Sequence, residues 1–562
     1  MQEFVYYNKE KLDFPLSEDI KIAKKDDVLS NEDFLISNSK EIQAEFYAPE
    51  IDFYIKNSKD SLPSKMQNTK KLYEINALRF DNAKDMLYKQ DINSRVLLIA
   101  NKDEKDEFLS FAKVDDFELF NISALPVKTI TGSIGNLKVV FDDEGEDFTL
   151  EVAQIVWYNA KEIAFKQSGS FDPRQSSSQE VVKNLKENIK KYTYKKFISY
   201  DPLICQYHER REETCAKCVE VCPTTAIIKI DKAKHLQFSQ IDCHGCGGCI
   251  SVCPSGALDY TPSPKEALYE MSKFYKNQIP LIVPQKMNIE TLECEIKPNV
   301  LPFAIEGEKF LHEATLLTLI QESGSQIIFY SDFLSKGTKD SIEILNNIFQ
   351  IKYKKDAVLI AMNKEELKKA LKKVDFIKNS FYTVNQEGSR KREIFALRLK
   401  HLVGEEDLGL VKTGEHIHYG KIQINQDKCT LCLSCVGACN MDALSAHSED
   451  NTLRFNASLC TSCGYCVSTC PEEECISLQE DTIELKPSWF KDEILAKDEL
   501  FACLECGKEF ATKKAIEKIA KMMLPLFKGD KIKQRTLYCC EDCKPKIMMQ
   551  SYIPQEKEGA KS

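Results

Sequence analysis

The chain carries CAKCVEVC at residues 215–222 and CHGCGGCISVCP at residues 243–254. It repeats this pattern as CLSCVGAC at residues 432–439 and CTSCGYCVSTCP at residues 460–471. Seven cysteines of each copy correspond at a fixed offset of 217 residues (432 minus 215). Both copies read C-x2-C-x3-C, then twenty residues, then C-x2-C-x2-C-x3-C-P. Such self-similarity predicts two copies of one cysteine-rich unit and decides the fold of both segments.

The spacing is typical of iron–sulfur ligation. Two residues between thiolates let a tight loop wrap three of them around one face of a cluster, and the fourth comes from a distant segment. Cys429 completes the second copy, whereas the first copy has Glu212 at that place and Cys205, seven residues upstream, as the expected replacement. We therefore expect four [4Fe–4S] clusters. The predicted ligand sets are Cys205, Cys215, Cys218 with Cys253; Cys243, Cys246, Cys249 with Cys222; Cys429, Cys432, Cys435 with Cys470; and Cys460, Cys463, Cys466 with Cys439.

Zinc sites or disulfides are the alternative for these cysteines. Zinc sites usually come as two separated pairs, not as triplets with a fourth cysteine before proline. Residues 200–262 and 424–480 resemble two bacterial-type 2[4Fe–4S] ferredoxin modules in tandem. Asn440 departs from the pattern at a position where the other runs have proline, which is no ligand. His244 either donates a hydrogen bond to a cluster sulfur and tunes its potential, or faces solvent.

The composition limits the class of protein. The chain has 562 residues, too many for one hydrophobic core, so several domains are expected. No apolar run approaches the length of a membrane span, and the N-terminus lacks a signal sequence, so we expect a cytoplasmic protein without an integral membrane segment. In a reducing compartment, 23 cysteines indicate metal binding. The net charge of −10 argues against a nucleic-acid partner.

A second metal-binding pattern lies near the C-terminus. Two C-x2-C pairs, Cys503 with Cys506 and Cys540 with Cys543, have zinc-ribbon spacing and predict a structural zinc, with a rubredoxin-like iron as the alternative. Cys539 leaves the choice of ligand open between itself and its neighbour. Cys475 is not needed for any of these sites and is interpreted as a plain buried thiol. The lysines between the two pairs form either a solvated face or a docking surface for an acidic partner.

The predicted fold is multidomain, α/β plus α+β, with six regions. In the N-terminal region of unknown role, helices are expected at Glu18–Ile22 and Tyr73–Tyr88. In the central domain, strands alternate with helices, one of them at Ile289–Glu295, which predicts a parallel sheet of flavodoxin-like type. The expected regions are 1–90; 91–165, a small α/β domain; 181–262, the first ferredoxin module; 279–400, the central α/β domain; 421–485, the second ferredoxin module; and 498–550, a zinc-ribbon-like module.

Two further resemblances bear on function. Residues 301–332 resemble part of the small iron–sulfur subunit that couples hydrogenases to heterodisulfide reductases. The whole layout, with CQYH at 205–208 and CLECGKEFAT at 503–512, resembles multi-cluster 4Fe–4S ferredoxin-like proteins associated with formate dehydrogenase systems. The second resemblance implies a link to formate oxidation or to maturation of that enzyme, by association and not from any residue's chemistry.

Three functions are weighed. An electron-transfer protein is favoured, which carries electrons on four clusters between a low-potential donor and a partner oxidoreductase. The alternative is an accessory, assembly or redox-sensing protein with structural clusters and a zinc docking module. A flavin enzyme using the central domain is third. We identify no nucleophile–base pair, no open catalytic metal and no nucleotide fingerprint, so we expect no catalytic site in the chain itself. Donor, acceptor, potentials and oligomeric state are left open.

Overall fold

The computed structural model describes residues 4–7, 16, 20–23, 34–39, 44–113, 116–123 and 125–550. Its contacts divide the chain into two units. The first comprises residues 1–398 with 414–417, and the second comprises residues 399–413 with 418–562. Within the described ranges, no helix is both long enough and apolar enough to cross a membrane.

The N-terminal region of the first unit combines a parallel sheet with two helices, α2 (Pro49–Asn57) and α3 (Leu62–Asn82). The sheet packs against helix α3, because the Tyr6 ring of the sheet lies edge-on against the Tyr73 ring of the helix, with 4.7 Å between the ring centroids. The strands, in the order β2-β1-β3-β4, are β1 (Phe4–Tyr7), β2 (Ile20–Ala23), β3 (Phe34–Ser37) and β4 (Phe46–Tyr47).

Both helix predictions in this region need correction. Residues 20–22 form part of strand β2, because a short apolar run carries too little periodicity to separate strand from helix. Glu18 and Asp19 lie outside the described residues. The second helix ends at Asn82, and Leu87–Gln90 forms strand β5, which pairs antiparallel with β13 (Tyr192–Lys195). This pairing joins segments about a hundred residues apart, which no local pattern reports.

The following α/β region has a parallel sheet in the order β12-β11-β6-β7 and an antiparallel sheet in the order β10-β9-β8. Helix α4 begins with a capping box, in which the Asn101 side chain accepts from the Glu104 N–H and the Glu104 carboxylate accepts from the Asn101 N–H. Helix α5 packs Val181 and Leu185 into the same core as Val96. The elements are β6 (Arg95–Ile99), α4 (Lys102–Phe111), β7 (Glu118–Ile122), β8 (Val127–Thr131), β9 (Leu137–Asp143), β10 (Glu146–Val152), β11 (Gln154–Trp157), β12 (Ser170–Phe171) and α5 (Ser178–Lys190).

The two cysteine-rich segments have one local fold, which follows the sequence repeat. Each has an outer antiparallel pair, an inner hairpin and two short helices. In the first segment these are β14 (Ile198–Tyr200) with β17 (Leu258–Tyr260), β15 (Ile227–Ile230) with β16 (His235–Phe238), α6 (Lys217–Glu220) and α7 (Gly248–Val252). In the second they are β23 (Gly420–Ile424) with β26 (Ile476–Glu480), β24 (Leu444–His447) with β25 (Thr452–Phe455), α13 (Ser434–Ala438) and α14 (Tyr465–Ser468).

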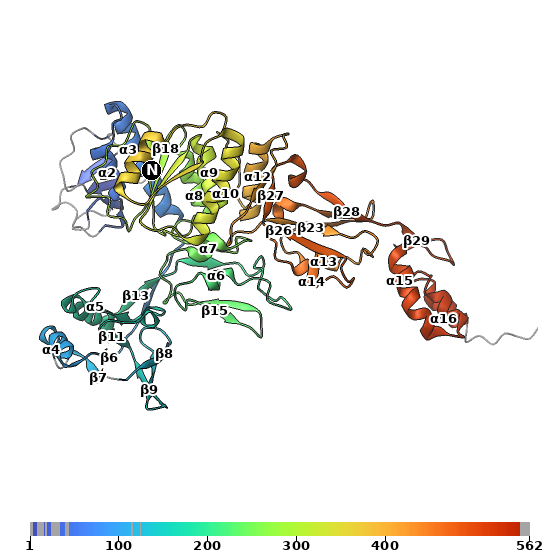
Figure 1. Ribbon diagram of the computed structural model, residues 1–562, viewed down its shortest axis with the longest axis horizontal. Helices are drawn as coiled ribbons and strands as arrows, with labels where there is room; N and C mark the ends of the chain where they lie inside the picture. Colours follow the sequence, from blue (N-terminus) through green and yellow to red (C-terminus); the bar gives the residue numbers. More distant parts are fainter. Residues whose placement is uncertain are drawn as a thin grey trace, which may run out of the picture. The chain divides into compact units, whose positions relative to one another are not determined.

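The central region of the first unit, where Figure 1 labels β18, α8, α9 and α10, has a parallel sheet in the order β19-β18-β20-β21. Every residue of β18, β19 and β20 is buried, which is the pattern of strands covered on both faces. The elements are α8 (Lys265–Lys273), β18 (Ile279–Pro284), β19 (Val300–Ile305), α9 (Glu313–Ser323), β20 (Ile327–Tyr330), α10 (Lys336–Tyr353), β21 (Val358–Ala361), α11 (Lys364–Lys373) and α12 (Lys391–Val403).

The helix expected at Ile289–Glu295 is wrong. That segment consists of turns and extended chain between β18 and β19. Ile296 forms an isolated parallel bridge with Ser58, and its N–H and C=O bond the backbone of Asn57 and Lys59 at 3.0 Å each. Tertiary pairing with the N-terminal region therefore replaces the helix that the local pattern favoured.

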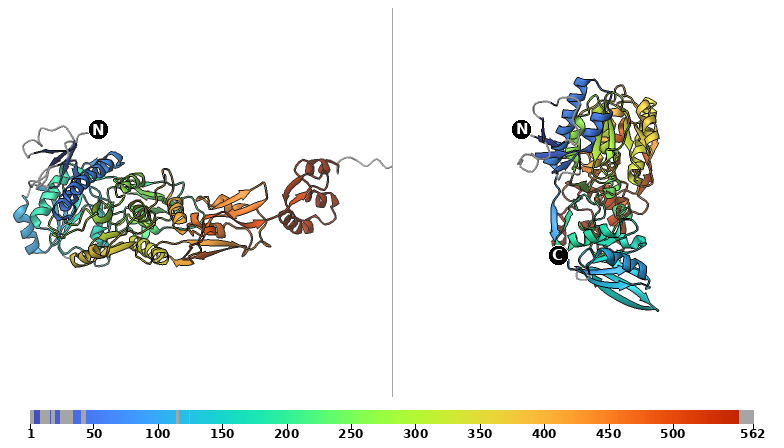
Figure 2. Two further views of the ribbon diagram at one scale, coloured as in Figure 1. Left: turned by 90° about the horizontal axis from the view of Figure 1, so that it is seen from above. Right: turned by 90° about the vertical axis from the view of Figure 1, so that its left-hand side faces the viewer.

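The second unit adds strands and a C-terminal helical region to the repeated module. In the left view of Figure 2 its strands β23 to β28 are orange and its helices α15 to α17 are red. Strand β28 extends the inner hairpin by pairing with β25. The remaining elements are β22 (Leu410–Lys412), β27 (Thr482–Glu484), β28 (Glu493–Lys497), β29 (Leu500–Ala502), β30 (Glu509–Thr512), α15 (Lys513–Met523), α16 (Lys531–Thr536) and α17 (Lys544–Gln550).

Candidate metal centres

The first predicted ligand set surrounds one small cavity, which we call the Cys205 cavity. Its wall includes Cys205, Cys215, Cys218 and Cys253. Burial, and then the charges of Cys253 and Cys205, raise the pKa of Cys215 to about 12. Glu212 is exposed, whereas Cys205 is 7 % exposed. The structure therefore brings the cysteine, and not the carboxylate, to the other three thiols.

The second set lines a separate cavity, with Cys222, Cys243, Cys246 and Cys249 in its wall. Burial raises the pKa of Cys243 to about 11, and Cys246 and Cys222 act in the same direction. His244 lines the same cavity, and burial lowers the pKa of its imidazole. The neutral ring therefore stands beside the thiols and not in open solvent.

The loop that carries the second set is held from outside the module. The buried carboxylate of Asp242 accepts hydrogen bonds from the hydroxyls of Ser133, Ser168 and Ser239 at 2.5 to 2.9 Å. Gly247 has φ 78°, and a Cβ added there would lie 2.4 Å from Cβ of Phe310. Glycine at this position thus allows the ligand loop to approach the central region closely.

The second module repeats this grouping. Burial raises the pKa of Cys435 to about 12, with further contributions from Cys429, Cys432 and Cys470. Burial likewise raises the pKa of Cys466, and the charges of Cys460, Cys463 and Cys439 raise it as well. Each of these two thiols is therefore influenced mainly by its own predicted set, and Cys435 also acts on Cys466 across the two sets.

One thiol has a position that the sequence interpretation missed. Burial raises the pKa of Cys475 to about 12, and Cys429 and Cys470 add to the effect, so this thiol stands next to the first set of the second module. Its Sγ donates to the Asn425 carbonyl at 3.7 Å. Its structural equivalent in the first module is Ala257, since the carbonyls of Ala257 and Cys475 accept from the N–H groups of Asp201 and Asn425, the residues that follow β14 and β23. Only the strand pairing of β26 reveals the proximity.

These donor sets fit iron–sulfur clusters. Each offers four soft thiolates, the ligand type that clusters use. Deprotonating several buried thiols side by side is unfavourable, as the raised pKa values show. A cluster of iron ions would displace the protons and compensate the thiolate charges.

The C-terminal cysteines form a compact four-thiol group. The sulfur atoms of Cys503, Cys506, Cys540 and Cys543 all lie within 4.8 Å of one another. Burial pushes the pKa of Cys503 up, but backbone N–H groups, that of Cys540 foremost, donate to its sulfur and bring the pKa down to about 6. The Cys539 thiol instead donates to the Arg535 carbonyl at 3.3 Å. The geometry therefore selects Cys540 for the group, which has the donor set of a tetrahedral zinc site.

Comparison with known families agrees with the repeated geometry. Residues 186–263 and residues 421–471 each match the family model of a 4Fe–4S dicluster domain. These segments are ferredoxin-like 4Fe–4S modules. No curated protein matches the chain.

Proposed function

We propose that this chain is an electron-transfer protein that holds four [4Fe–4S] clusters and passes electrons between a low-potential donor and a partner oxidoreductase. The observation that carries the proposal is the grouping of sixteen cysteines into four sets, two in each module, in which thiols of one set raise one another's pKa values. The 4Fe–4S dicluster matches support the cofactor class. When bound, such clusters supply one-electron redox chemistry over a potential range that the protein tunes.

The chain's own residues have three tasks in this function. The ligand cysteines hold and space the clusters, and the two sets of each module adjoin, since Cys218 acts on Cys249 and Cys435 acts on Cys466. Buried surroundings and hydrogen bonds set the potentials. Cys432 is an exposed ligand, so a partner that reaches its set would approach at this face.

The four-thiol group near the C-terminus is proposed to hold a structural zinc. A closed four-thiolate site contributes folding free energy and leaves no position open for a substrate. This group also supports the second candidate function, an accessory or assembly protein for an oxidoreductase, because electron transfer by itself does not require it. Formate dehydrogenase or its maturation factors are the partner that the resemblance of the chain implies for either function.

The proposal is tested by an anaerobic redox titration followed by electron paramagnetic resonance, with iron and zinc counted on the same sample. We expect about sixteen iron and one zinc per chain, with several clusters reduced at low potential and coupled in pairs. Clusters that bind in full but cannot be reduced would overturn electron transfer and favour the accessory function. Deleting residues 502–562 separates the two further, since only an accessory protein would lose its effect on a client while retaining electron transfer.

A further inference from the structure

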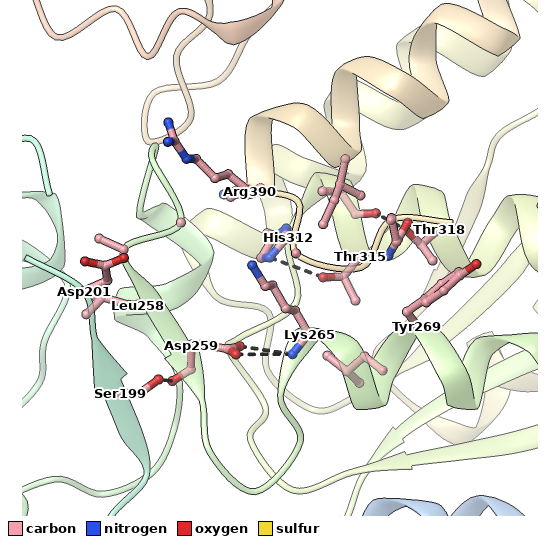
Figure 3. A pocket seen from close by; sticks show the side chains of 18 of the residues that line it. Ser199, Asp201, Leu258, Asp259, Lys265, Tyr269, His312, Thr315, Thr318 and Arg390 are labelled. Carbon is pink, nitrogen blue, oxygen red and sulfur yellow. Dashed lines mark hydrogen bonds between the residues drawn. The ribbon is translucent and has the colours of Figure 1, made fainter. Parts of the chain in front are cut away.

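The first unit contains a cavity of about 520 Å³ that the proposed electron transfer does not use. Figure 3 shows side chains that line it. Its volume lies in the range of small-molecule sites, roughly 300 to 1,000 Å³. The wall comes from β14 and β17 of the first module, from α8 and α9, and from the chain before α12. No motif in the sequence points to it, because its residues are drawn from six separate segments, Phe303 of β19 among them.

One part of the wall is polar and cationic. The Lys265 Nζ donates to the Ser389 carbonyl at 2.8 Å and lies 3.8 Å from the Glu266 Oε1, so at least one of its three protons is left for another acceptor. His312 lies nearby: burial, and then the charges of Lys391 and Lys265, lower the pKa of its ring to about 3, so it is neutral at physiological pH. In Figure 3 the Lys265 side chain extends toward His312.

The imidazole of His312 has unused hydrogen-bonding capacity. Its Nε2 lies 3.3 Å from the Thr315 hydroxyl oxygen. Its Nδ1 is buried and has no hydrogen-bond partner among the described residues. Buried polar atoms are rarely left unpaired, since a missing hydrogen bond at such an atom costs about 1 to 3 kcal/mol. In the tautomer in which the Thr315 hydroxyl donates to Nε2, the ring proton lies on Nδ1, where no described residue accepts it.

The rest of the wall is largely apolar or already paired. Leu268, Leu319 and Ile394 contribute hydrocarbon surface. The Tyr269 hydroxyl donates to the Val384 carbonyl at 2.6 Å, which turns its ring into a further apolar surface. The carboxyl group of Asp259 accepts from the backbone N–H groups of Tyr260 and Lys265. The unused donors are therefore concentrated at Lys265 and His312.

We propose that this cavity binds a small organic carboxylate. The carboxylate accepts from Lys265 and His312, and the hydrocarbon body lies against the apolar wall. One ammonium group and one imidazole N–H suit a monoanion, whereas phosphate sites usually offer several cationic or backbone donors. The volume and the apolar lining exceed what an inorganic anion would use.

The cavity adjoins the proposed cluster site. Tyr200, Ala257 and Leu258 line both this cavity and the Cys205 cavity. A bound carboxylate is thus separated from the Cys205 set by one layer of side chains. This part of the inference rests on the proposed function, whereas binding itself does not.

The test is isothermal calorimetry on the full anaerobic chain with benzoate, phenylacetate and hexanoate. Benzamide and inorganic phosphate serve as comparison ligands, and iron is counted on the same sample. We expect saturable binding of at least one carboxylate and none of the amide. Lys265→Met and His312→Leu should each weaken it roughly tenfold or more, because each removes a hydrogen bond to a charged group. Lys369→Met, on exposed α11 away from the cavity, should change nothing.

The outcomes separate the two proposals. Flat titrations with all three carboxylates, or equal weakening by Lys369→Met, would overturn the site. Phosphate binding as tightly as the carboxylates would show a general anion site and overturn the organic class. Carboxylate binding by a chain that holds no iron would leave the cavity assigned and remove the proposed electron transfer. A chain that holds its full iron but binds no carboxylate would overturn the cavity proposal and leave the proposed electron transfer standing.

Discussion

The two ferredoxin-like modules share one cysteine pattern but are held by different neighbours. In the first, Lys391 Nζ donates to the carbonyls of Ser251 and Cys253 at 3.0 and 3.2 Å, and Arg392 Nε donates to the Pro254 carbonyl at 3.0 Å. These two residues begin α12, so the central region holds the chain around Cys253, the last predicted ligand of the first module.

The second module is instead held by contacts with α15 and with Thr512, which precedes it. Lys518 of α15 pairs with Glu472, two residues after Cys470. The Thr512 hydroxyl donates to the Thr430 carbonyl at 2.9 Å, next to Cys429. The repeated spacing thus makes the clusters' ligand sets alike, while unrelated segments decide how firmly each set is held.

Burial separates the modules as well. Four ligands of the first module are buried, namely Cys205, Cys218, Cys249 and Cys253, whereas in the second only Cys429 and Cys435 are. Reduction adds negative charge, which a buried environment disfavours. We therefore expect the first module to be reduced at lower potential than the second, and the redox titration resolves this order once single-cluster variants assign the signals.

The largest expected effect is the loss of a whole cluster. Cys205→Ser and Cys429→Ser each remove one of four thiolates, so each should cost the iron of one cluster, measured by iron analysis and paramagnetic resonance. Cys294→Ser, at a buried cysteine outside all sets, is the matched control and should leave iron unchanged. Unchanged iron in Cys205→Ser alone would show that the two modules complete their first clusters by different ligand types.

The second largest effect is expected at the C-terminal module, whose helix α15 contacts the second ferredoxin-like module. Cys503→Ser should abolish zinc binding and unfold the C-terminal module, because such sites contribute on the order of 10 kcal/mol. Since α15 contacts the segments around Cys429 and Cys470, proteolysis should become faster there and stay unchanged in the first module. Cys539→Ser is the control and should retain zinc. Loss of iron in place of zinc would reverse the metal assignment.

The anchor of the first module is tested through its buried ion pair. Glu313 Oε2 lies 3.2 Å from Lys391 Nζ, and both side chains are almost fully buried. Glu313→Gln leaves the ammonium group unpaired and should destabilise the first unit by about 3 to 5 kcal/mol, read as a lower urea midpoint and faster hydrogen exchange over residues 248–258. The double variant with Lys391→Met should recover much of the loss. Equal destabilisation in both variants would contradict the pairing.

The same pair predicts an acid dependence. Burial alone would raise the pKa of Glu313, but Lys391, His312 and Arg392 bring it down to about 2 from the ordinary 4.5. A carboxyl group whose pKa is lowered by folding stabilises the fold at pH values above its pKa in the unfolded chain. This contribution is lost as the pH falls from 4.5 toward 2. Urea midpoints should therefore fall across this window, and less steeply in the double variant.

The smallest effect is expected where the modules differ by one thiol. Cys475→Ala gives the second module the residue of the first, and Ala257→Cys makes the reverse exchange. Iron content should stay unchanged. Losing a polar thiol beside the ligands should lower the potential of that cluster by about 1 kcal/mol, or roughly 40 mV for one electron. The reverse variant should raise its cluster's potential. Iron loss in Cys475→Ala would make Cys475 a ligand.

The alternation of strands with helices predicted the parallel sheet between residues 279 and 361, because apolar periodicity and turn residues act within a few positions. They failed at Ile20–Ala23, at residues 87–90 and at Ile289–Glu295. In the last two cases, strand or bridge pairing with a distant segment replaced the local preference.

The sequence by itself predicted which cysteines fall into each set, since ligand spacing is a local property and the repeat states it twice. Tertiary structure decided the rest. It brought Cys205 to its set and left Glu212 in solvent, chose Cys540 over Cys539, placed Cys475 beside a cluster site, and joined Lys265 to His312 in one cavity. These positions depend on burial and on contacts between segments far apart in the chain, which spacing along the sequence does not encode.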